Sequence, residues 1–175
     1  MSHSGFLIDI RDIANDLGAT VHLDAGVEVP VLAVGEQSYP ASRPAHVLGY
    51  LANTGSGIVL SGTVELEVGA VCSRCLVPFP LPVSGELEGF YVEHGREDEL
   101  PEEQEIGFVE DGYVDIMPAI DAALALGMPF APLHDEKCAG ICPTCGADLN
   151  AGPCTCKPDV SDSPFAALKD LLPPE

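Results

Sequence analysis

Basic residues are what this sequence has least of. Seven lysines and arginines stand against 28 aspartates and glutamates, which gives the 175 residues a formal net charge of −21. Affinity for nucleic acid comes from clustered lysine and arginine that displace counterions from phosphates, and seven cations spread along the chain cannot form an extended footprint. Extensive direct RNA binding is therefore not expected, and the charge favours a basic protein as partner. The alternative is that the acidic residues serve only to keep the protein soluble.

Long apolar runs are missing as well. No stretch approaches the roughly 18 to 20 apolar residues that a membrane-spanning helix needs. The first residues, 1–5, have neither the basic nor the apolar segment that begins a secretion signal. We therefore expect a cytoplasmic protein with no membrane partner. Because thiols stay reduced in that compartment, its seven cysteines favour metal or redox chemistry over structural disulfides.

The motifs of familiar enzymes are also absent. The sequence has no glycine-rich phosphate loop, no serine nucleophile elbow and no HExxH. Its CxxC pairs lack the helix and βαβ setting of a redox motif, and sulfur-rich metal sites without a nearby acid or base are typically structural. The sequence therefore predicts a protein that is not an enzyme. The alternative from another class is a zinc or thiol redox sensor, or a metal-dependent redox protein.

What the sequence does have is a clear β-hairpin pattern. With 46% hydrophobic residues, the chain is long enough to build one core. Apolar and polar residues alternate over 57–92, which predicts two long strands with Cys72 and Cys75 near the tip that joins them. Such a turn resembles a zinc knuckle, in which two sulfurs project from one loop.

The flanking regions predict shorter elements. Residues 5–18 fit a strand that passes into a short helix, and the prolines within 19–50 fit short edge strands and loops. Residues 94–105 are rich in carboxylates and predict an acidic loop. Strands at 108–109 and 113–114 could close the sheet.

Two helices are expected in the C-terminal half. Asp115 can N-cap the first, which has Pro118 in its first turn and should pack on the sheet. The second spans residues 161–172. The predicted fold class is α+β, with an antiparallel sheet or hairpin core, a packed helix and a C-terminal zinc-binding knuckle segment. Residues 1–130 form the α+β domain. Residues 131–175 form a zinc-binding segment, which docks through its metal sites onto the hairpin at residues 72–75.

The cysteines are grouped like metal ligands. The two CxxC pairs begin at Cys72 and Cys142, and each is half of a tetrahedral zinc site, since both thiolates can reach an ion about 2.3 Å away. Seven thiols cannot fill two such sites, but His134, four residues before Cys138, offers an eighth donor. The simplest pairing makes a first site and a second site: Cys72, Cys75, His134 and Cys138, and Cys142, Cys145, Cys154 and Cys156.

Other pairings remain open. A single site could use Cys138, Cys142 and Cys145 with either Cys154 or Cys156, which would leave the hairpin pair without metal. Two zinc ions per chain is the leading hypothesis and one ion is the alternative. Iron bound as in rubredoxin would also use two CxxC turns, and a chain without metal is the remaining case.

Two motifs then suggest a family. CSRCL at residues 72–76 and GICPTCGADLN at residues 140–150 follow one another along the chain. In this order, they resemble the YceD-like family of large ribosomal RNA subunit accumulation proteins, over residues 5–172. The resemblance implies that both groups of cysteines belong to the family pattern. The chain departs from it at His134, where many relatives have cysteine, and at residues 163–165, where SPF replaces the usual Asp-Pro-Arg.

The resemblance implies a bacterial or plastid factor that supports accumulation of 23S ribosomal RNA and has no known catalytic activity. We therefore expect a non-enzymatic factor in large ribosomal subunit biogenesis that binds a basic ribosomal protein or a large-subunit precursor. Three cations beside the cysteine turns are placed to touch RNA or a partner locally, namely Arg74, Lys137 and Lys157. A salt bridge within the protein would serve each of them equally well.

Overall fold

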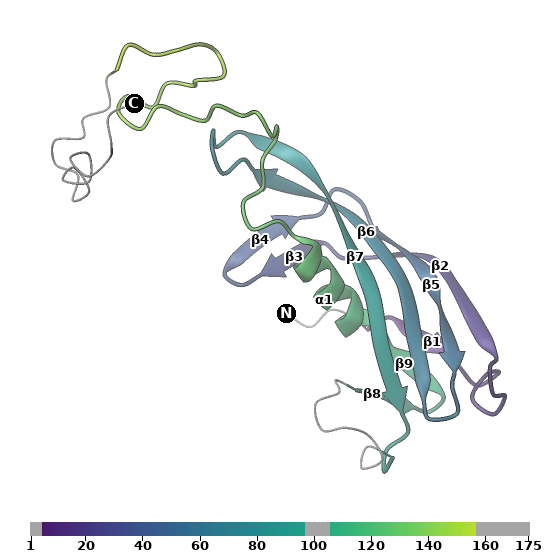
Figure 1. The fold of residues 1–175 in the computed structure, drawn as a ribbon. Coiled ribbons are helices and arrows are strands. Elements are labelled where there is room, and N and C mark those ends of the chain that lie inside the picture. Colours follow the sequence, from purple (N-terminus) through teal and green to yellow (C-terminus); the bar gives the residue numbers. More distant parts are fainter. Residues whose placement is uncertain (1–4, 97–105, 157–175) are drawn as a thin grey trace, which may run out of the picture.

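The computed structural model describes residues 5–96 and 106–156, and in these residues the chain is mostly β-structure (Figure 1). The strands are β1 (Leu7–Asp9), β2 (Thr20–Val27), β3 (Val31–Val34), β4 (Gln37–Pro40), β5 (Ala45–Asn53), β6 (Ile58–Val71), β7 (Pro78–Val92), β8 (Gly107–Glu110) and β9 (Tyr113–Asp115), and the helix is α1 (Met117–Gly127). One helix of 11 residues makes the described fold mostly β, which corrects the expected α+β class.

The large sheet contains seven strands in the order β1-β9-β8-β7-β6-β5-β2, and β3 and β4 pair separately. Its longest part is the antiparallel hairpin of β6 and β7, which runs in register from Ile58 opposite Tyr91 to Val71 opposite Pro78. Strict alternation along both strands predicted this hairpin, and the structure confirms it. The turn at its tip holds the first CxxC pair.

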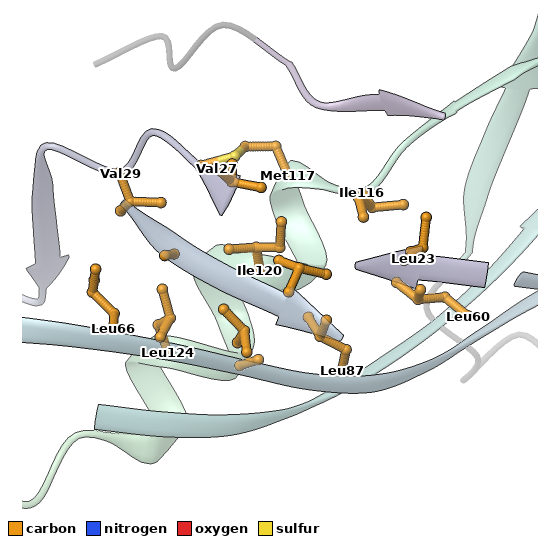
Figure 2. Close-up of a cluster of buried hydrophobic side chains, with 14 of the residues drawn as sticks. Leu23, Val27, Val29, Leu60, Leu66, Leu87, Ile116, Met117, Ile120 and Leu124 are labelled. Atoms are coloured by element: carbon orange, nitrogen blue, oxygen red, sulfur yellow. The ribbon is translucent and has the colours of Figure 1, made fainter. Parts of the chain in front are cut away.

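The core lies between one face of this sheet, α1 and the β3–β4 hairpin. Figure 2 shows leucines of β6 and β7 facing the apolar side chains of α1 and of Ile116, the residue before it. Helix and strand approach closely at Gly85 of β7, where an added Cβ would lie 2.2 Å from the carbonyl oxygen of Ala123. Ile120 and Leu124 are completely buried in this contact layer, each worth about 1.5 to 3 kcal/mol of stabilisation. The predicted packing of the helix on the sheet is therefore confirmed.

The start of α1 differs from the expected capping. The N-cap position is Ile116, which makes no side-chain cap hydrogen bond. Oδ1 of Asp115 accepts hydrogen bonds from the backbone N–H of Met117 at 3.0 Å and from that of Phe6 at 2.9 Å. Asp115 therefore ties the helix start to the N-terminal segment, and Pro118 lies in the first turn as predicted.

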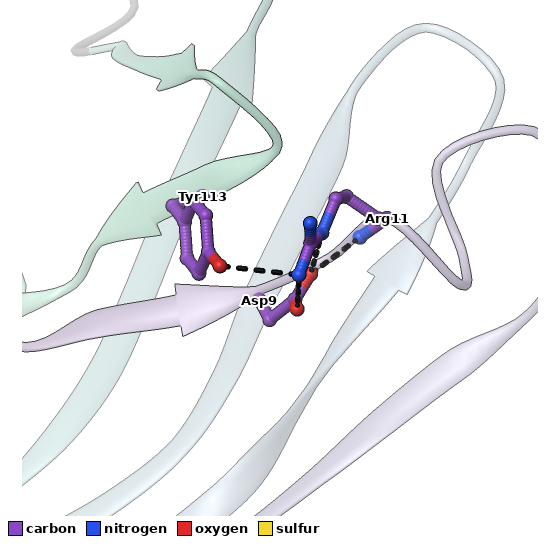
Figure 3. Close-up of polar contacts among 3 residues, drawn as sticks. All are labelled: Asp9, Arg11 and Tyr113. Atoms are coloured by element: carbon purple, nitrogen blue, oxygen red, sulfur yellow. Dashed lines mark hydrogen bonds and ion pairs between the residues drawn. The ribbon is translucent and has the colours of Figure 1, made fainter.

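The short helix predicted after β1 is wrong. Residues 11–18 form successive turns. The side-chain amide of Asn53 donates to the carbonyl oxygens of Ile13 and Ala14 at 2.8 and 2.9 Å, so these turns are held to β5. The preceding strand is held by Arg11, which bonds to Asp9 and to the Tyr113 hydroxyl (Figure 3).

The Arg11 contact also has an electrostatic effect on the strand. Hydrogen bonds from the Arg11 guanidinium and backbone lower the pKa of Asp9 from 3.8 to about 2. The guanidinium also lies over the ring of Tyr113, 5.2 Å from its centroid. These contacts join β1 to β9, its antiparallel neighbour at the sheet edge.

The remaining expectations divide between those confirmed and those corrected. β3 and β4 are short, as the prolines predicted, but β5 is an internal strand between β2 and β6. β8 and β9 extend the sheet as predicted, although β8 pairs with β7 in parallel. The predicted helix at 161–172 and most of the acidic loop, 97–105, lie outside the described residues. Within 5–96 and 106–156, no helix has the length and apolar character needed to cross a membrane.

Candidate metal centres

The first CxxC pair lies in a closed turn at the tip of the β6–β7 hairpin. The N–H of Cys72 donates to the carbonyl of Val77 at 3.0 Å, and the N–H of Leu76 donates to the carbonyl of Cys72 at 2.9 Å. Leu76 has a φ of 61°, in a left-handed region that costs an L-residue about 1 to 2 kcal/mol. Both cysteine side chains are buried, and the turn places both sulfur atoms where they could bind one metal ion.

The second CxxC pair repeats this turn. The N–H of Cys142 donates to the carbonyl of Ala147 at 2.8 Å, and the N–H of Gly146 donates to the carbonyl of Cys142 at 2.9 Å. Gly146 has a φ of 73°, so it occupies the position that Leu76 occupies in the first turn. Here the left-handed residue is a glycine, for which the conformation carries little steric cost.

At the first turn, the chain beyond α1 returns and supplies two more donor atoms. Cys138 Sγ lies 3.8 Å from Cys72 Sγ, and His134 Nδ1 lies 3.3 Å from Cys75 Sγ. All four donor atoms lie within 4.8 Å of one another. Donors about 2.0 to 2.3 Å from one ion in a tetrahedron are roughly 3.5 to 3.8 Å apart. The first group therefore fits a tetrahedral ion without large movement.

The second turn collects its donors locally. The sulfur atoms of Cys142, Cys145, Cys154 and Cys156 also lie within 4.8 Å of one another. Cys142 is buried, Cys145 is exposed, and the other two are half-buried. The structure thus brings together each of the two sets that the spacing predicted, and both could hold a metal ion.

Hydrogen bonds from the protein favour one thiolate in each group. Burial alone would raise the pKa of Cys72, but hydrogen bonds from the backbone N–H of Cys75 and from His134 lower it to about 5. The backbone N–H of Cys145 is the main cause that lowers the pKa of Cys142 to about 6. The first cysteine of each CxxC turn is therefore prepared to be an anion.

The neighbouring thiols shift in the opposite direction. The N–H of Val77 favours the thiolate of Cys75, but burial and hydrogen bonding with Cys72 raise its pKa to about 11. A hydrogen bond with Cys145 raises the pKa of Cys156 to about 12. Crowded sulfurs cannot all ionise unless a cation offsets their charge, as a divalent ion does. Three sulfurs with one imidazole suit zinc, and four sulfurs suit zinc or iron.

One residue with a role at these sites was not singled out from the sequence. Asn150 belongs to the second turn's loop, yet its Nδ2 lies 3.6 Å from Cys138 Sγ of the first group. Its Oδ1 accepts a hydrogen bond from the N–H of Ala139 at 2.7 Å. Such outer contacts orient ligands and tune the metal. Asn150 therefore connects the second loop to the first group, a role that depends on the tertiary fold.

The cations expected to touch a partner have different surroundings. Arg74 donates from Nη1 to the carbonyls of Glu136 and Cys138, at 3.2 and 2.9 Å, so it braces the returning segment. Lys137 is exposed beside the same group, and its backbone N–H donates to Asp135 Oδ1 at 2.7 Å. Lys157 lies outside the described residues.

The described fold is mostly β, and its cysteine turns belong to two groups of donors that could hold metal ions, one of them at the hairpin tip. The family model described as Large ribosomal RNA subunit accumulation protein YceD matches residues 60–172, and the chain belongs to that family. The match begins in β6 and includes the hairpin, α1 and both groups of cysteines.

Three relatives illustrate the range of similarity. An uncharacterized protein of Mycobacterium tuberculosis is 31% identical over 174 residues, which is 99% of this chain and 72% of the relative. One of Mycobacterium leprae is 30% identical over 119 residues, 67% of this chain and 54% of the relative. The large ribosomal RNA subunit accumulation protein YceD of Haemophilus influenzae is 30% identical over 82 residues, 46% of this chain and 47% of the relative. No solved structure matches.

Proposed function

We propose that this protein is a non-enzymatic factor in large ribosomal subunit biogenesis that supports the accumulation of 23S ribosomal RNA. The observation that carries the proposal is the family match over residues 60–172, which spans the hairpin and both candidate metal centres. The named relative from Haemophilus influenzae, a large ribosomal RNA subunit accumulation protein, supports it. The protein would act in the cytoplasm, by binding a basic ribosomal protein or a large-subunit precursor.

Two zinc ions per chain would serve this function as structural cross-links. The first ion would be held by Cys72, Cys75, His134 and Cys138, and the second by Cys142, Cys145, Cys154 and Cys156. The distances of 3.8 and 3.3 Å within the first group support a tetrahedral ion. Eight donors fill two four-coordinate sites, so neither ion would keep an open position for substrate. In this view, residues 131–175 form a metal-binding segment docked onto a body of residues 1–130.

Charge supports a basic protein as the partner. A net charge of −21 repels phosphate and attracts lysine-rich and arginine-rich surfaces. Arg74 and Lys137 are exposed beside the first group, and they could make a local RNA contact within a precursor particle. Arg74 would then do so while holding its backbone partners.

The proposal is tested in cells that lack the gene for this protein. We expect the ratio of 23S to 16S ribosomal RNA to fall and large-subunit precursors to accumulate on a density gradient. The tagged protein should co-migrate with those precursors. If ribosomal RNA levels stay unchanged and the protein remains at the top of the gradient, the assembly role is wrong.

A second candidate function, thiol sensing, is favoured by the exposure of the second group. Cys145 is exposed while its partners are half-buried or buried, and accessible thiolates oxidise first. A sensor would lose metal under mild oxidant and form a reversible disulfide between Cys142 and Cys145. Retention of both metal ions under the same oxidant would contradict this candidate.

A further inference from the structure

The face of the large sheet opposite α1 is open to solvent. Successive side chains on a strand alternate between the two faces, so the buried side chains of β5, β6 and β7 face the core and the residues between them face outward. Two large apolar residues point outward from β5, Leu48 at 52% exposure and Tyr50 at 41%. In the described part of the chain, no element covers them.

A shallow groove of about 370 Å³ runs along β6 on this face. Its floor is made of the small residues Ser61, Gly62 and Thr63. The register places Leu48 opposite Thr63, and places Thr63 opposite Glu86 on its other side. The groove therefore has an apolar wall on β5 and an acidic wall on β7, because Tyr50 and Glu88 flank Ser61 in the same way.

Among the residues that the structure describes, no cation neutralises the acidic wall. Glu86 and Glu88 are exposed, and neither side-chain carboxylate has a hydrogen-bonded or ion-paired partner among residues 5–96 and 106–156. The strands that form this face, β2, β5, β6 and β7, contain no lysine or arginine. On the described part of this face, an ion pair joins His46 to Asp24 at 2.8 Å, one row further along the sheet. The face therefore offers negative charge to a ligand.

The two walls together select a ligand that is both cationic and apolar. Lysine and arginine carry aliphatic stems that pack on apolar side chains while the charged head pairs with a carboxylate. An arginine can also lie over the ring of an exposed tyrosine. Phosphate would be repelled by Glu86 and Glu88, so nucleic acid does not fit this groove.

We propose that the groove between Leu48 and Tyr50 on one side and Glu86 and Glu88 on the other binds an extended basic segment of a protein. Its cations pair with the two glutamates, and its apolar residues or aliphatic stems cover Leu48 and Tyr50. This inference rests on the proposed function in one respect, since basic ribosomal proteins are the partners named there. The groove is lined by seven residues, whereas a stable interface takes about 20 to 30 from each partner, so the contact is salt-sensitive and adds to others.

The test is a binding titration with the full-length, zinc-loaded protein and a short fluorescent peptide in which arginine alternates with leucine. The variant Glu86→Lys with Glu88→Lys should weaken binding at least about tenfold. The control Glu28→Lys with Glu36→Lys makes the same change in net charge at exposed positions outside the groove. It should weaken binding no more than about threefold. Equal losses in both variants would overturn the proposal, because they would indicate general charge attraction.

A second variant separates shape from charge. Thr63→Trp fills the groove from an exposed strand position without changing the net charge. It should weaken binding at least about fivefold, whereas a peptide with glycine in place of leucine should bind the original protein more weakly. Unchanged affinity of Thr63→Trp would overturn the proposal. Circular dichroism and the thermal midpoint show that each variant is folded.

Failure here and failure of the proposed function are distinguishable. Peptide binding is measured in vitro, whereas the assembly role is measured by 23S ribosomal RNA in cells that lack the protein. If the groove variants bind normally while loss of the protein still lowers 23S ribosomal RNA, the groove proposal is wrong and the assembly role stands. If peptide binding behaves as expected while ribosomal RNA is unchanged, the groove proposal stands and the assembly role fails.

Discussion

At the hairpin tip and in the C-terminal segment, the chain makes the same CxxC turn twice, in different surroundings. The first turn is buried and takes its other donors from far along the chain, with Cys72 and Cys138 separated by 66 residues. The second turn completes its donor set within residues 142–156 and keeps Cys145 exposed. One backbone conformation thus belongs to a group of donors from distant parts of the chain in one place and to a local group in the other.

A CxxC turn therefore does not by itself determine which part of the fold a metal ion would stabilise. That depends on where in the chain the other two donor residues lie. At the first group, a metal would close a long loop that includes β7, β8, β9 and α1. At the second, it would order a short stretch with few buried side chains.

The largest expected effect is the loss of the first group. Cys138→Ser should lower the thermal midpoint by about 10 °C, because it removes a cross-link that closes a 66-residue loop. The control Cys154→Ser removes a ligand of the second group and should shift the midpoint of the body by no more than about 3 °C. Differential scanning calorimetry of the metal-loaded variants makes the measurement. Equal shifts would show that the two groups do not differ in this way.

The next largest expected difference is the order in which the two groups release their metal ions. Increasing chelator should remove the ion of the second group first, because three of its four cysteines are exposed or half-buried, whereas all three cysteines of the first group are buried. Native mass spectrometry should then pass through a species with one ion before the species with none. Cysteine alkylation of that intermediate should label Cys145 and leave Cys72 unlabelled. Simultaneous release of both ions would contradict the comparison.

A smaller effect is expected from Asn150, which belongs to the second loop but contacts Cys138 of the first group. Asn150→Ala removes the amide 3.6 Å from Cys138 Sγ, so metal affinity at the first group should fall about tenfold although the residue belongs to the second loop. The control Asn15→Ala changes an exposed asparagine away from both groups and should leave affinity unchanged. Zinc competition with a chromophoric chelator measures both variants. A loss confined to the second group would show that the Asn150 contact has no energetic role.

The sequence predicted those parts of the fold that depend on residues close together in the chain. Strict alternation over 57–92 predicted the hairpin, and its residues lie as expected because a strand with one buried face has few other registers. The helix predicted after β1 is a series of turns held by Asn53 of β5, which donates to the carbonyls of Ile13 and Ala14, and this contact between distant residues has no local signal. The parallel pairing of β8 with β7 likewise has no local signal.

The candidate metal centres follow the same division. Spacing predicted which donors gather, because two residues of a CxxC pair must share a turn and His134 lies four residues before Cys138. The contacts of Arg74 with the carbonyls of Glu136 and Cys138 depend on where the segment after α1 returns. That path is set by packing across the whole sheet, so the sequence near Arg74 carries no sign of it.

The smallest effect concerns the left-handed residue of each turn. Leu76→Gly should relieve the strain of a φ of 61°, worth about 1 to 2 kcal/mol, and lose about 0.5 to 1 kcal/mol through the freer unfolded chain. The reciprocal change, Gly146→Leu, introduces the same strain, and an added Cβ there meets nothing within 4 Å. Zinc affinity should therefore rise by about twofold to fivefold at the first group and fall by a similar factor at the second. Changes of the same sign at both turns would show that their backbones do not respond alike, and that the repeated conformation is only a geometric likeness.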